Sequence, residues 1–139
     1  MLFPKKELDL STPKVMGVLN LTPDSFFDGG KFLRKDNSFD ESKIINSIES
    51  MIEDGADFID IGAQSTKPGF TKISPSEELD RLGLVLDKLN DYPVLFSIDT
   101  FNYEVIKEAI NKKIDLINNV FSFSDQESFK LVCRNDIPI

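Results

Sequence analysis

The amino-acid sequence predicts a parallel α/β fold, because three observations agree. Four short apolar runs, rich in β-branched residues, are spread along the 139 residues, and such runs are typical of strands buried on both faces. Longer segments between them repeat their apolar residues at helical spacing. Polar residues directly follow the apolar runs, at the strand ends where parallel sheets bind ligands.

The strand-like runs cover residues 15–19, 58–61, 94–98 and 115–118, and residues 137–139 indicate the start of a fifth strand. The helical stripes between them begin near Ile44, Leu79 and Val105. The order β-α-β-α-β-α-β-α-β fits a small doubly wound sheet or part of a (β/α)8 barrel. A complete barrel needs about 250 residues, so on the barrel interpretation residues 1–139 are one domain truncated at its C-terminus.

Helix boundaries carry clear local signals. Three serines are each followed by a glutamate three residues later, the spacing of a capping box, and these are Ser38, Ser74 and Ser124. Pro75 then occupies the favoured first helical position. Gly55 is placed to end the first helix in a left-handed cap.

Composition excludes several classes of function. The formal net charge of −8 leaves no basic face for nucleic acid or an anionic membrane. The absence of histidine rules out a His-based triad and a typical zinc site within this chain. We expect no signal peptide and no membrane span, because no apolar run is suitable. The single cysteine, Cys133, lies in an apolar pattern that predicts a core thiol and favours a reducing cytoplasm.

The first polar loop follows the run that ends near Asn20. Asn20 either caps the turn through its amide or supplies an oxygen ligand to a hard cation such as Mg²⁺ beside a phosphate. Asp24 and Ser25 are typical turn-capping residues. Phe26 and Phe27 are adjacent in a glycine-flanked loop and cannot both face the core, so one of them is a candidate contact for an aromatic ligand.

The second polar loop follows the run that ends near Gly62. Ser65 and Thr66 offer hydroxyl groups and Lys67 offers a positive charge, while Gly62 and Gly69 let the backbone come close to a ligand. These features favour an oxyanion site. The alternative is a solvated loop without a ligand.

Carboxylates and carboxamides mark the remaining strands. Asp60 lies inside an apolar strand, where a buried network is the favoured interpretation. Asp99 ends the third strand and either caps the next helix or faces a ligand. Asn118 and Asn119 end the fourth strand at the same rim. A carboxylate and a carboxamide placed there suit a flat heterocycle with donor and acceptor edges.

Two segments, NLTPDSFFDGG at 20–30 and DIGAQSTKPG at 60–69, resemble the signatures of the dihydropteroate synthase family within the pterin-binding barrel superfamily. The SIDT segment at 97–100 and the region 116–120 resemble its third and fourth strand ends. The resemblance covers essentially the whole chain. It implies a pterin-binding domain with the first half of a (β/α)8 TIM barrel, that is, four βα units and the start of a fifth strand.

The resemblance implies a transferase that joins 4-aminobenzoate to 6-hydroxymethyl-7,8-dihydropterin diphosphate, releasing diphosphate and forming 7,8-dihydropteroate. By position, Asn20 would contact Mg²⁺, Thr66 would bind phosphate, and Asp99 with Asn118 would hold the pterin. Five residues of the two loops would surround 4-aminobenzoate, where sulfonamides compete: Phe26, Asp28, Ser65, Lys67 and Pro68. Of these assignments, Asp99, Asp28 and Lys67 carry the expected catalytic roles, with Asp99 favouring cation development by its charge.

The sequence departs from the family pattern at Gln64, Lys67 and Asn119, where the family more often has glutamate, arginine and aspartate. Lysine keeps the charge of arginine but loses its planar fork. The family also draws later groups from the other half of the barrel, so we expect little or no turnover from this chain alone and a possible homodimer. The alternatives are a non-catalytic half-barrel that binds a pterin or a partner, and a methyltetrahydrofolate-binding methyltransferase of the same superfamily.

Overall fold

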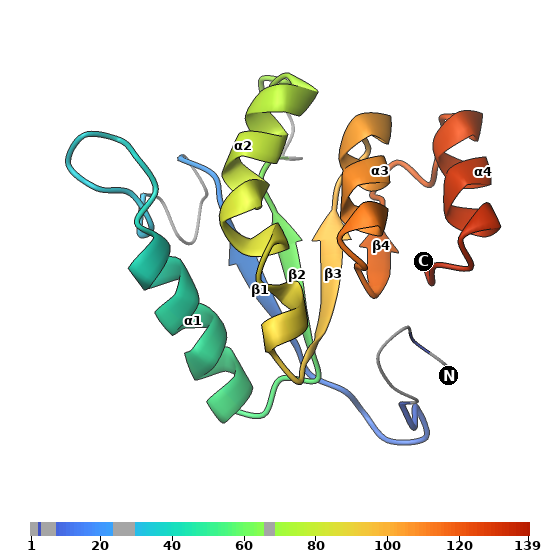
Figure 1. The fold of residues 1–139 in the computed structure, drawn as a ribbon, viewed down its shortest axis with the longest axis horizontal. Helices are drawn as coiled ribbons and strands as arrows, with labels where there is room; N and C mark the ends of the chain where they lie inside the picture. The colour runs from blue at the N-terminus through green and yellow to red at the C-terminus, as the bar shows by residue number, and fades with distance from the viewer. Residues whose placement is uncertain (1–2, 4–7, 24–29, 66–68) are drawn as a thin grey trace.

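The computed structural model describes residues 3, 8–23, 30–65 and 69–139. Its centre is a parallel sheet of β1 (Met16–Asn20), β2 (Phe58–Gly62), β3 (Leu95–Asp99) and β4 (Leu116–Asn118), shown in Figure 1. The strands pair in the sequential order β1-β2-β3-β4, all parallel. A doubly wound sheet reverses its order at a switch point, whereas sequential order is that of a barrel wall. The predicted strand boundaries differ from the observed ones by one residue.

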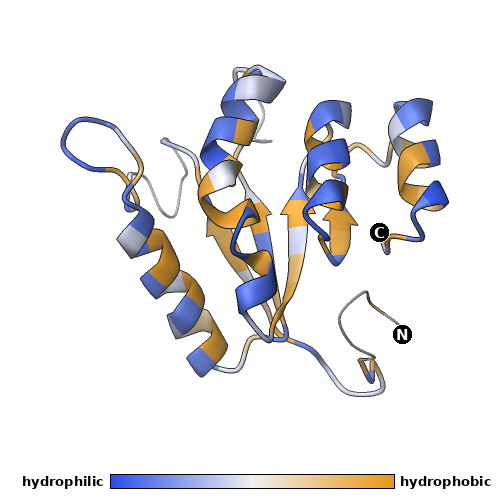
Figure 2. Ribbon diagram, in the orientation of Figure 1, coloured by the Kyte–Doolittle hydropathy of each residue, from blue (hydrophilic) through white to orange (hydrophobic). Residues whose placement is uncertain are grey.

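Four helices follow the strands and pack on one face of the sheet (Figure 1). They are α1 (Glu41–Glu53), α2 (Pro75–Leu86), α3 (Tyr103–Asn111) and α4 (Gln126–Arg134), with a short 3-10 helix η1 (Leu89–Asp91) after α2. The helices are striped with polar and apolar residues in Figure 2, whereas the strands are mostly apolar. This difference follows from burial, since a helix buries one stripe, whereas β2 and β3 are buried on both faces and β1 has exposed residues on the face opposite the helices.

The N-caps confirm one of the three predicted positions. Ser74 caps α2, with its Oγ accepting from the Glu77 amide at 3.2 Å, and Pro75 is the first helical residue. The predictions at Ser38 and Ser124 are wrong, because Asp40 caps α1 and Asp125 caps α4. Aspartate is an equally good cap, and its charge also favours the positive end of the helix dipole.

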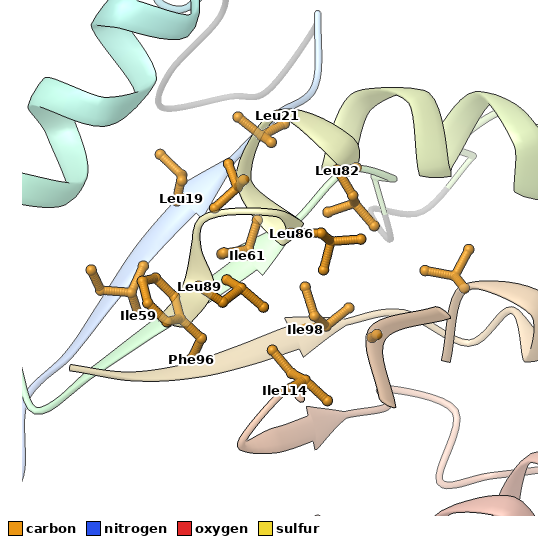
Figure 3. Packing of buried hydrophobic residues seen from close by; sticks show 14 of the residues in the cluster. Leu19, Leu21, Ile59, Ile61, Leu82, Leu86, Leu89, Phe96, Ile98 and Ile114 are labelled. Carbon is orange, nitrogen blue, oxygen red and sulfur yellow. The ribbon is translucent and has the colours of Figure 1, made fainter. Parts of the chain in front are cut away.

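The main core lies between the sheet and the helices. Strand residues such as Leu19, Ile61 and Phe96 are fully buried against α2, whose inner face carries Leu82 and Leu86 (Figure 3). Burying each such side chain stabilises the fold by about 1.5–3 kcal/mol. The left-handed Gly55, with a φ of +92°, ends α1 as predicted and returns the chain towards β2.

The opposite face of the sheet has a smaller apolar cluster, formed by Phe3 and Leu8 against Phe58 and Leu95. The rings of Phe3 and Phe58 pack edge to face with their centroids 5.4 Å apart. This cluster covers the amino ends of the strands. Val18, nearer to the carboxyl end of β1, is 52% exposed on the same face.

The C-terminal residues beyond α4 return to the sheet. The Ile117 amide of β4 donates to the Pro138 carbonyl at 3.0 Å, although residues 137–139 are not assigned as a strand. The prediction that Cys133 is a core thiol is wrong, because Cys133 is exposed while its neighbour Val132 is buried. Successive helical residues are turned by about 100°, so only one of these two side chains faces the sheet. Within the described ranges, no helix has the length and apolarity needed to cross a membrane.

Candidate functional site

The last residues of the four strands form one row across the carboxyl edge of the sheet. Asn20 pairs with Gly62, Gly62 with Asp99, and Asp99 with Asn118. Paired residues in a sheet project to the same face, which here is the face opposite the helices. A Cβ added at Gly62 would lie 3.5 Å from Asn20 Oδ1 and 3.8 Å from Asp99 Oδ2. The side chains of Asn20 and Asp99 therefore flank the position above Gly62.

A second polar row lies two residues earlier on the same face. It contains the buried residues Asp60 and Ser97, which pair directly across β2 and β3. Asn118 Nδ2 donates to Asp60 Oδ2 at 3.1 Å. The prediction that Asp60 belongs to a buried network is therefore confirmed, and the network includes the site residue Asn118.

Three buried oxygens in these rows have no hydrogen-bond partner among the described residues: Asp60 Oδ1, Ser97 Oγ and Asp99 Oδ1. Buried polar atoms of native proteins are nearly always paired. Their concentration on one face at one end of the sheet indicates a place where a polar ligand or further protein groups complete the bonding.

The carboxyl group of Asp99 lies in an environment that opposes its negative charge. Burial is the main cause, and the nearby carboxylates of Asp60 and Glu78 add to it, so the pKa of Asp99 is raised to about 6. At a pH close to 6 both protonation states are populated, and the protonated carboxyl can donate a hydrogen bond that the carboxylate can only accept. That property suits the recognition of a heterocycle edge.

Asn20 is the residue that fits a metal ion best. Its amide oxygen faces the position above Gly62. In the described part of the chain, no group of three or more histidine, cysteine, aspartate or glutamate residues forms a metal cage. Mg²⁺ commonly takes one or two protein oxygens and completes its shell with water and substrate phosphate, so this donor set fits a substrate-bridged ion. The turn-capping alternative involves Asp24 and Ser25, which lie outside the described residues.

The loops after β1 and β2 meet beside this row. Pro23 from the first loop and Ser65 from the second line a pocket of about 210 Å³, together with Gln64 and Phe70. Gln64 Oε1 accepts from the Ile73 amide at 3.1 Å, which fixes the second loop internally. Ser65 is thus placed in a concave site near the carboxyl edge.

The remaining predicted loop residues, Phe26, Asp28, Thr66, Lys67 and Pro68, lie outside the described residues, as do Asp24, Ser25 and Phe27. Of the predicted site residues, the structure therefore brings Asn20, Asp99 and Asn118 into one row, with Ser65 in the neighbouring pocket.

Asn119, predicted at the same rim as Asn118, lines one pocket together with it, and its side-chain oxygen is engaged in the turn that follows. Its Oδ1 accepts from the amides of Phe121 at 3.0 Å and Phe123 at 3.3 Å, so it holds the turn after β4. Asn119 lies beyond Asn118, the last residue of β4, so only Asn118 is part of the paired row.

The sequence interpretation missed two buried groups. Ser97 was identifiable from strand alternation, since it lies two residues before Asp99 and shares its face. Glu78 on α2 is fully buried. Its burial could have been predicted from the sequence, because Glu78 lies four residues before Leu82 and therefore on the apolar face of the helix.

Comparisons with known proteins agree with this geometry. A family profile described as pterin binding enzyme matches residues 16–139. The chain is 47% identical over 129 residues to the mitochondrial folate synthesis bifunctional protein of Arabidopsis thaliana. This alignment covers 89% of this chain and 22% of that protein. It is 37% identical over 135 residues to the dihydropteroate synthase of Haemophilus influenzae, covering 96% of this chain and 47% of that protein.

Solved structures give the same result. The Yersinia pestis dihydropteroate synthase in complex with a sulfonamide drug superposes with a TM-score of 0.86 at 35% identity, over 99% of this chain and 48% of that chain. The Xanthomonas albilineans dihydropteroate synthase with 4-aminobenzoic acid superposes with a TM-score of 0.79 at 34% identity, over 94% of this chain and 47% of that chain.

The sequential parallel sheet, with helices on one face, defines a (β/α) barrel segment, and its polar row lies at the end where barrels of this kind bind ligands. This chain belongs to the pterin binding enzyme family. It spans about half the length of the matched dihydropteroate synthases, and less of the bifunctional proteins.

Proposed function

We propose that this chain is the N-terminal portion of a dihydropteroate synthase, a transferase of folate biosynthesis. The reaction condenses 4-aminobenzoate with 6-hydroxymethyl-7,8-dihydropterin diphosphate and gives 7,8-dihydropteroate and diphosphate. The observation that carries the proposal is the row that joins Asn20, Asp99 and Asn118 above the unpartnered oxygens of Asp60 and Ser97. Family membership and the relatives support the same assignment.

In this proposal the pterin ring lies against β3 and β4. Asp99 and Asn118 present an acid and an amide side by side, and such a pair can match the alternating donors and acceptors of a pterin edge. Asp60 orients the Asn118 amide through their hydrogen bond. Because Asp99 is partly buried next to other carboxylates, its charge would favour a cationic pterin during the reaction.

In this proposal the loops after β1 and β2 bind the diphosphate and the 4-aminobenzoate. Asn20 would hold Mg²⁺, which when bound neutralises charge on the diphosphate, and Thr66 would bind the phosphate. Ser65, Phe26 and Pro68 would contact 4-aminobenzoate. The bond between the pterin methylene and the diphosphate oxygen breaks first, and the amine then forms the new carbon–nitrogen bond and loses a proton.

Asp28 and Lys67 complete the proposed loop assignments as catalytic residues. Loop residues of this kind order the reacting groups and exclude water when the loops close. Sulfonamides, which resemble 4-aminobenzoate, would compete at the surface of Phe26 and Pro68 in a complete enzyme. The chain alone is proposed to be inactive, because it spans about half of the related synthases.

The deciding experiment is reconstitution. The chain is mixed with the C-terminal half of the Haemophilus influenzae relative, supplied as a separate polypeptide, and formation of 7,8-dihydropteroate is followed with and without Mg²⁺. We expect product from the mixture that depends on Mg²⁺, and no product when Asp99→Ala replaces the natural chain. A mixture that assembles yet makes no product, while the chain still binds 6-hydroxymethylpterin, would favour the non-catalytic half-barrel.

Methyl transfer from methyltetrahydrofolate to a corrinoid protein would instead favour the methyltransferase of the same superfamily. The proposal also places the protein in the cytoplasm and allows it to form a homodimer. Cell fractionation tests the location, with a mitochondrial pool as the alternative outcome, since two of the plant relatives are named as mitochondrial.

A further inference from the structure

Glu78 of α2 is a carboxylate without exposure to solvent. Burying a charged group costs free energy unless it is paired or hydrogen bonded. Burial raises the pKa of Glu78, while hydrogen bonding to Thr100 and Asn102 opposes this shift. A group held at such a cost is expected to have a structural or functional purpose, and its neighbours identify one.

One hydrogen-bond partner of Glu78 is Asn102, whose Nδ2 donates to Glu78 Oε2. Asn102 is the N-cap residue of α3, a position where asparagine usually accepts a hydrogen bond from the first helical turn. Here the Asn102 side chain makes no cap bond, because it is directed to Glu78 instead. The Asn102 side chain therefore connects the start of α3 to α2 by a hydrogen bond instead of capping α3.

Asn102 belongs to the turn that follows Asp99. The backbone amide of Asn102 donates to Thr100 Oγ1 at 3.2 Å, and the backbone amide of Thr100 donates to the backbone carbonyl of Asn118 at 3.1 Å. The turn 99–102 is thus fixed on one side by β4 and on the other by Glu78. Asp99, its first residue, is the group that the site presents to a ligand.

The same helix holds the neighbouring loop through a different residue. Arg81 Nη1 donates to the Ala63 carbonyl at 2.9 Å, just after β2. Arg81 also pairs with Glu77 at 2.6 Å on the outer side of α2. One turn of α2 therefore contacts both loops of the site, with Glu78 serving the turn after β3 and Arg81 the loop after β2.

We propose that Glu78 is a positioning residue for the pterin site, acting through Asn102 to fix the turn that carries Asp99. The proposal rests on the proposed function, in which Asp99 binds the pterin. It predicts that the hydrogen bond, rather than the charge, is what matters. Glutamine keeps an acceptor oxygen and the shape of the side chain, so Glu78→Gln should retain the positioning, whereas Glu78→Ala should lose it.

The test compares these two variants with Leu82→Ala, a buried α2 substitution that weakens core packing and leaves both partners of the Glu78–Asn102 hydrogen bond in place. Hydrogen exchange is measured at the Thr100 and Asn102 amides, and 6-hydroxymethylpterin affinity is measured by calorimetry on the same folded samples. We expect Glu78→Ala to speed exchange at these two amides and to weaken pterin affinity about tenfold, a change equivalent to about 1.4 kcal/mol. Glu78→Gln and Leu82→Ala should leave both readings near those of the natural chain.

Equal pterin affinity and equal turn exchange in Glu78→Ala and the natural chain would overturn the proposal, as would a Glu78→Gln variant that behaves like Glu78→Ala. If Glu78→Ala does not fold, Glu78→Leu combined with Asn102→Ala replaces it, because removing both partners of a buried bond is often nearly neutral for stability. That double variant is expected to show the same two changes. Absence of pterin binding by the natural chain would instead count against the proposed function, while the exchange measurement would still test Glu78.

Discussion

Asp99 links the chemistry of the site to the stability of the fold. Its pKa of about 6 exceeds the value of about 4 for an aspartate in an unfolded chain. The folded protein therefore holds the proton more tightly, and the stabilising effect of protonation is complete below pH 4. It is lost as pH rises through 6, because the charged form must then be accommodated in a partly buried site.

Asp99→Asn has no carboxyl group to titrate at this position, so it should not lose stability as Asp99 ionises. Relative to the natural chain, its free energy of unfolding should rise by about 1–2 kcal/mol as the pH is raised from 4 to 6.5, after allowing for screening of a partly exposed group. Urea denaturation at several pH values measures the difference. Asp80→Asn, at an exposed position of α2, controls for general charge effects. Parallel stability curves for the natural chain and Asp99→Asn would contradict the prediction.

Gly62 tests where the ligand lies. A Cβ at this position meets its neighbours at 3.5–3.8 Å, which is ordinary van der Waals contact, so Gly62→Ala should fold normally. The added methyl group would occupy the space between Asn20 and Asp99. We expect 6-hydroxymethylpterin affinity to fall at least about tenfold, or about 1.4 kcal/mol, with little change in melting temperature. Unchanged affinity measured by calorimetry would place the pterin elsewhere on the sheet.

At the scale of single elements, α2 has a well-capped first turn and a destabilising glycine in its interior. Ser74 and Pro75 define its first turn, while Gly83 lies in the interior of the helix with open space around its Cβ position. Glycine in a helix interior costs conformational entropy without a benefit here. The helix that positions Glu78 and Arg81 is therefore open to improvement without contact with the site.

Gly83→Ala should raise the free energy of unfolding by about 0.5–1 kcal/mol. Chemical denaturation gives the value directly from the midpoint and slope. The matched control is Gly55→Ala, which should lower stability by about 1 kcal/mol, because Gly55 has a φ of +92° that other residues adopt only with strain. If both substitutions had the same sign, the conformational argument would be wrong.

The elements were also the scale at which the sequence was most informative. Apolar runs bounded by polar residues placed all four strands to within one residue, because short β-branched runs between polar turns are typical of strands, and β2 and β3 are buried on both faces. Caps were less predictable, since Asp40 and Asp125 compete with the serines nearby for the same helix starts. Cys133 was misplaced because an apolar string of residues does not say which side of a helix is buried.

The site itself was partly predictable for a related reason. Asn20, Asp99 and Asn118 were identified from their positions at strand ends, and parallel pairing then brings strand ends together. Glu78 and Ser97 were not identified, because their importance depends on contacts between segments far apart in the sequence. The choice between an open sheet and a barrel wall also required strand order, which local patterns do not contain.

At the scale of the whole molecule, the face opposite the helices is chemically divided. Phe3 and Leu8 cover Phe58 and Leu95 at its amino end, polar groups occupy its carboxyl edge, and Met16 and Val18 of the outer strand β1 are 43% and 52% exposed. Exposed apolar side chains on a sheet whose outer strands are unpaired along one edge favour association.

The isolated chain is therefore expected to self-associate through this face. Val18→Lys should raise the dissociation constant at least about tenfold, equivalent to about 1.4 kcal/mol, because a lysine would have to be buried on pairing. Analytical ultracentrifugation measures the shift. Leu10→Lys, at a residue 49% exposed outside the sheet, should leave association unchanged. Equal effects of the two lysines would show that the contact lies elsewhere.

The sequential pairing of the strands has a consequence for how the protein is made. Each strand joins the one that precedes it in the chain, and each connecting helix packs beside the strands it joins. A nascent chain that emerges N-terminus first can therefore add one βα unit after another, because the partner for every new strand has already left the ribosome. The strands begin at residues 16, 58, 95 and 116. Synthesis at about 5–20 residues per second therefore gives each unit about one to eight seconds to dock before the next arrives.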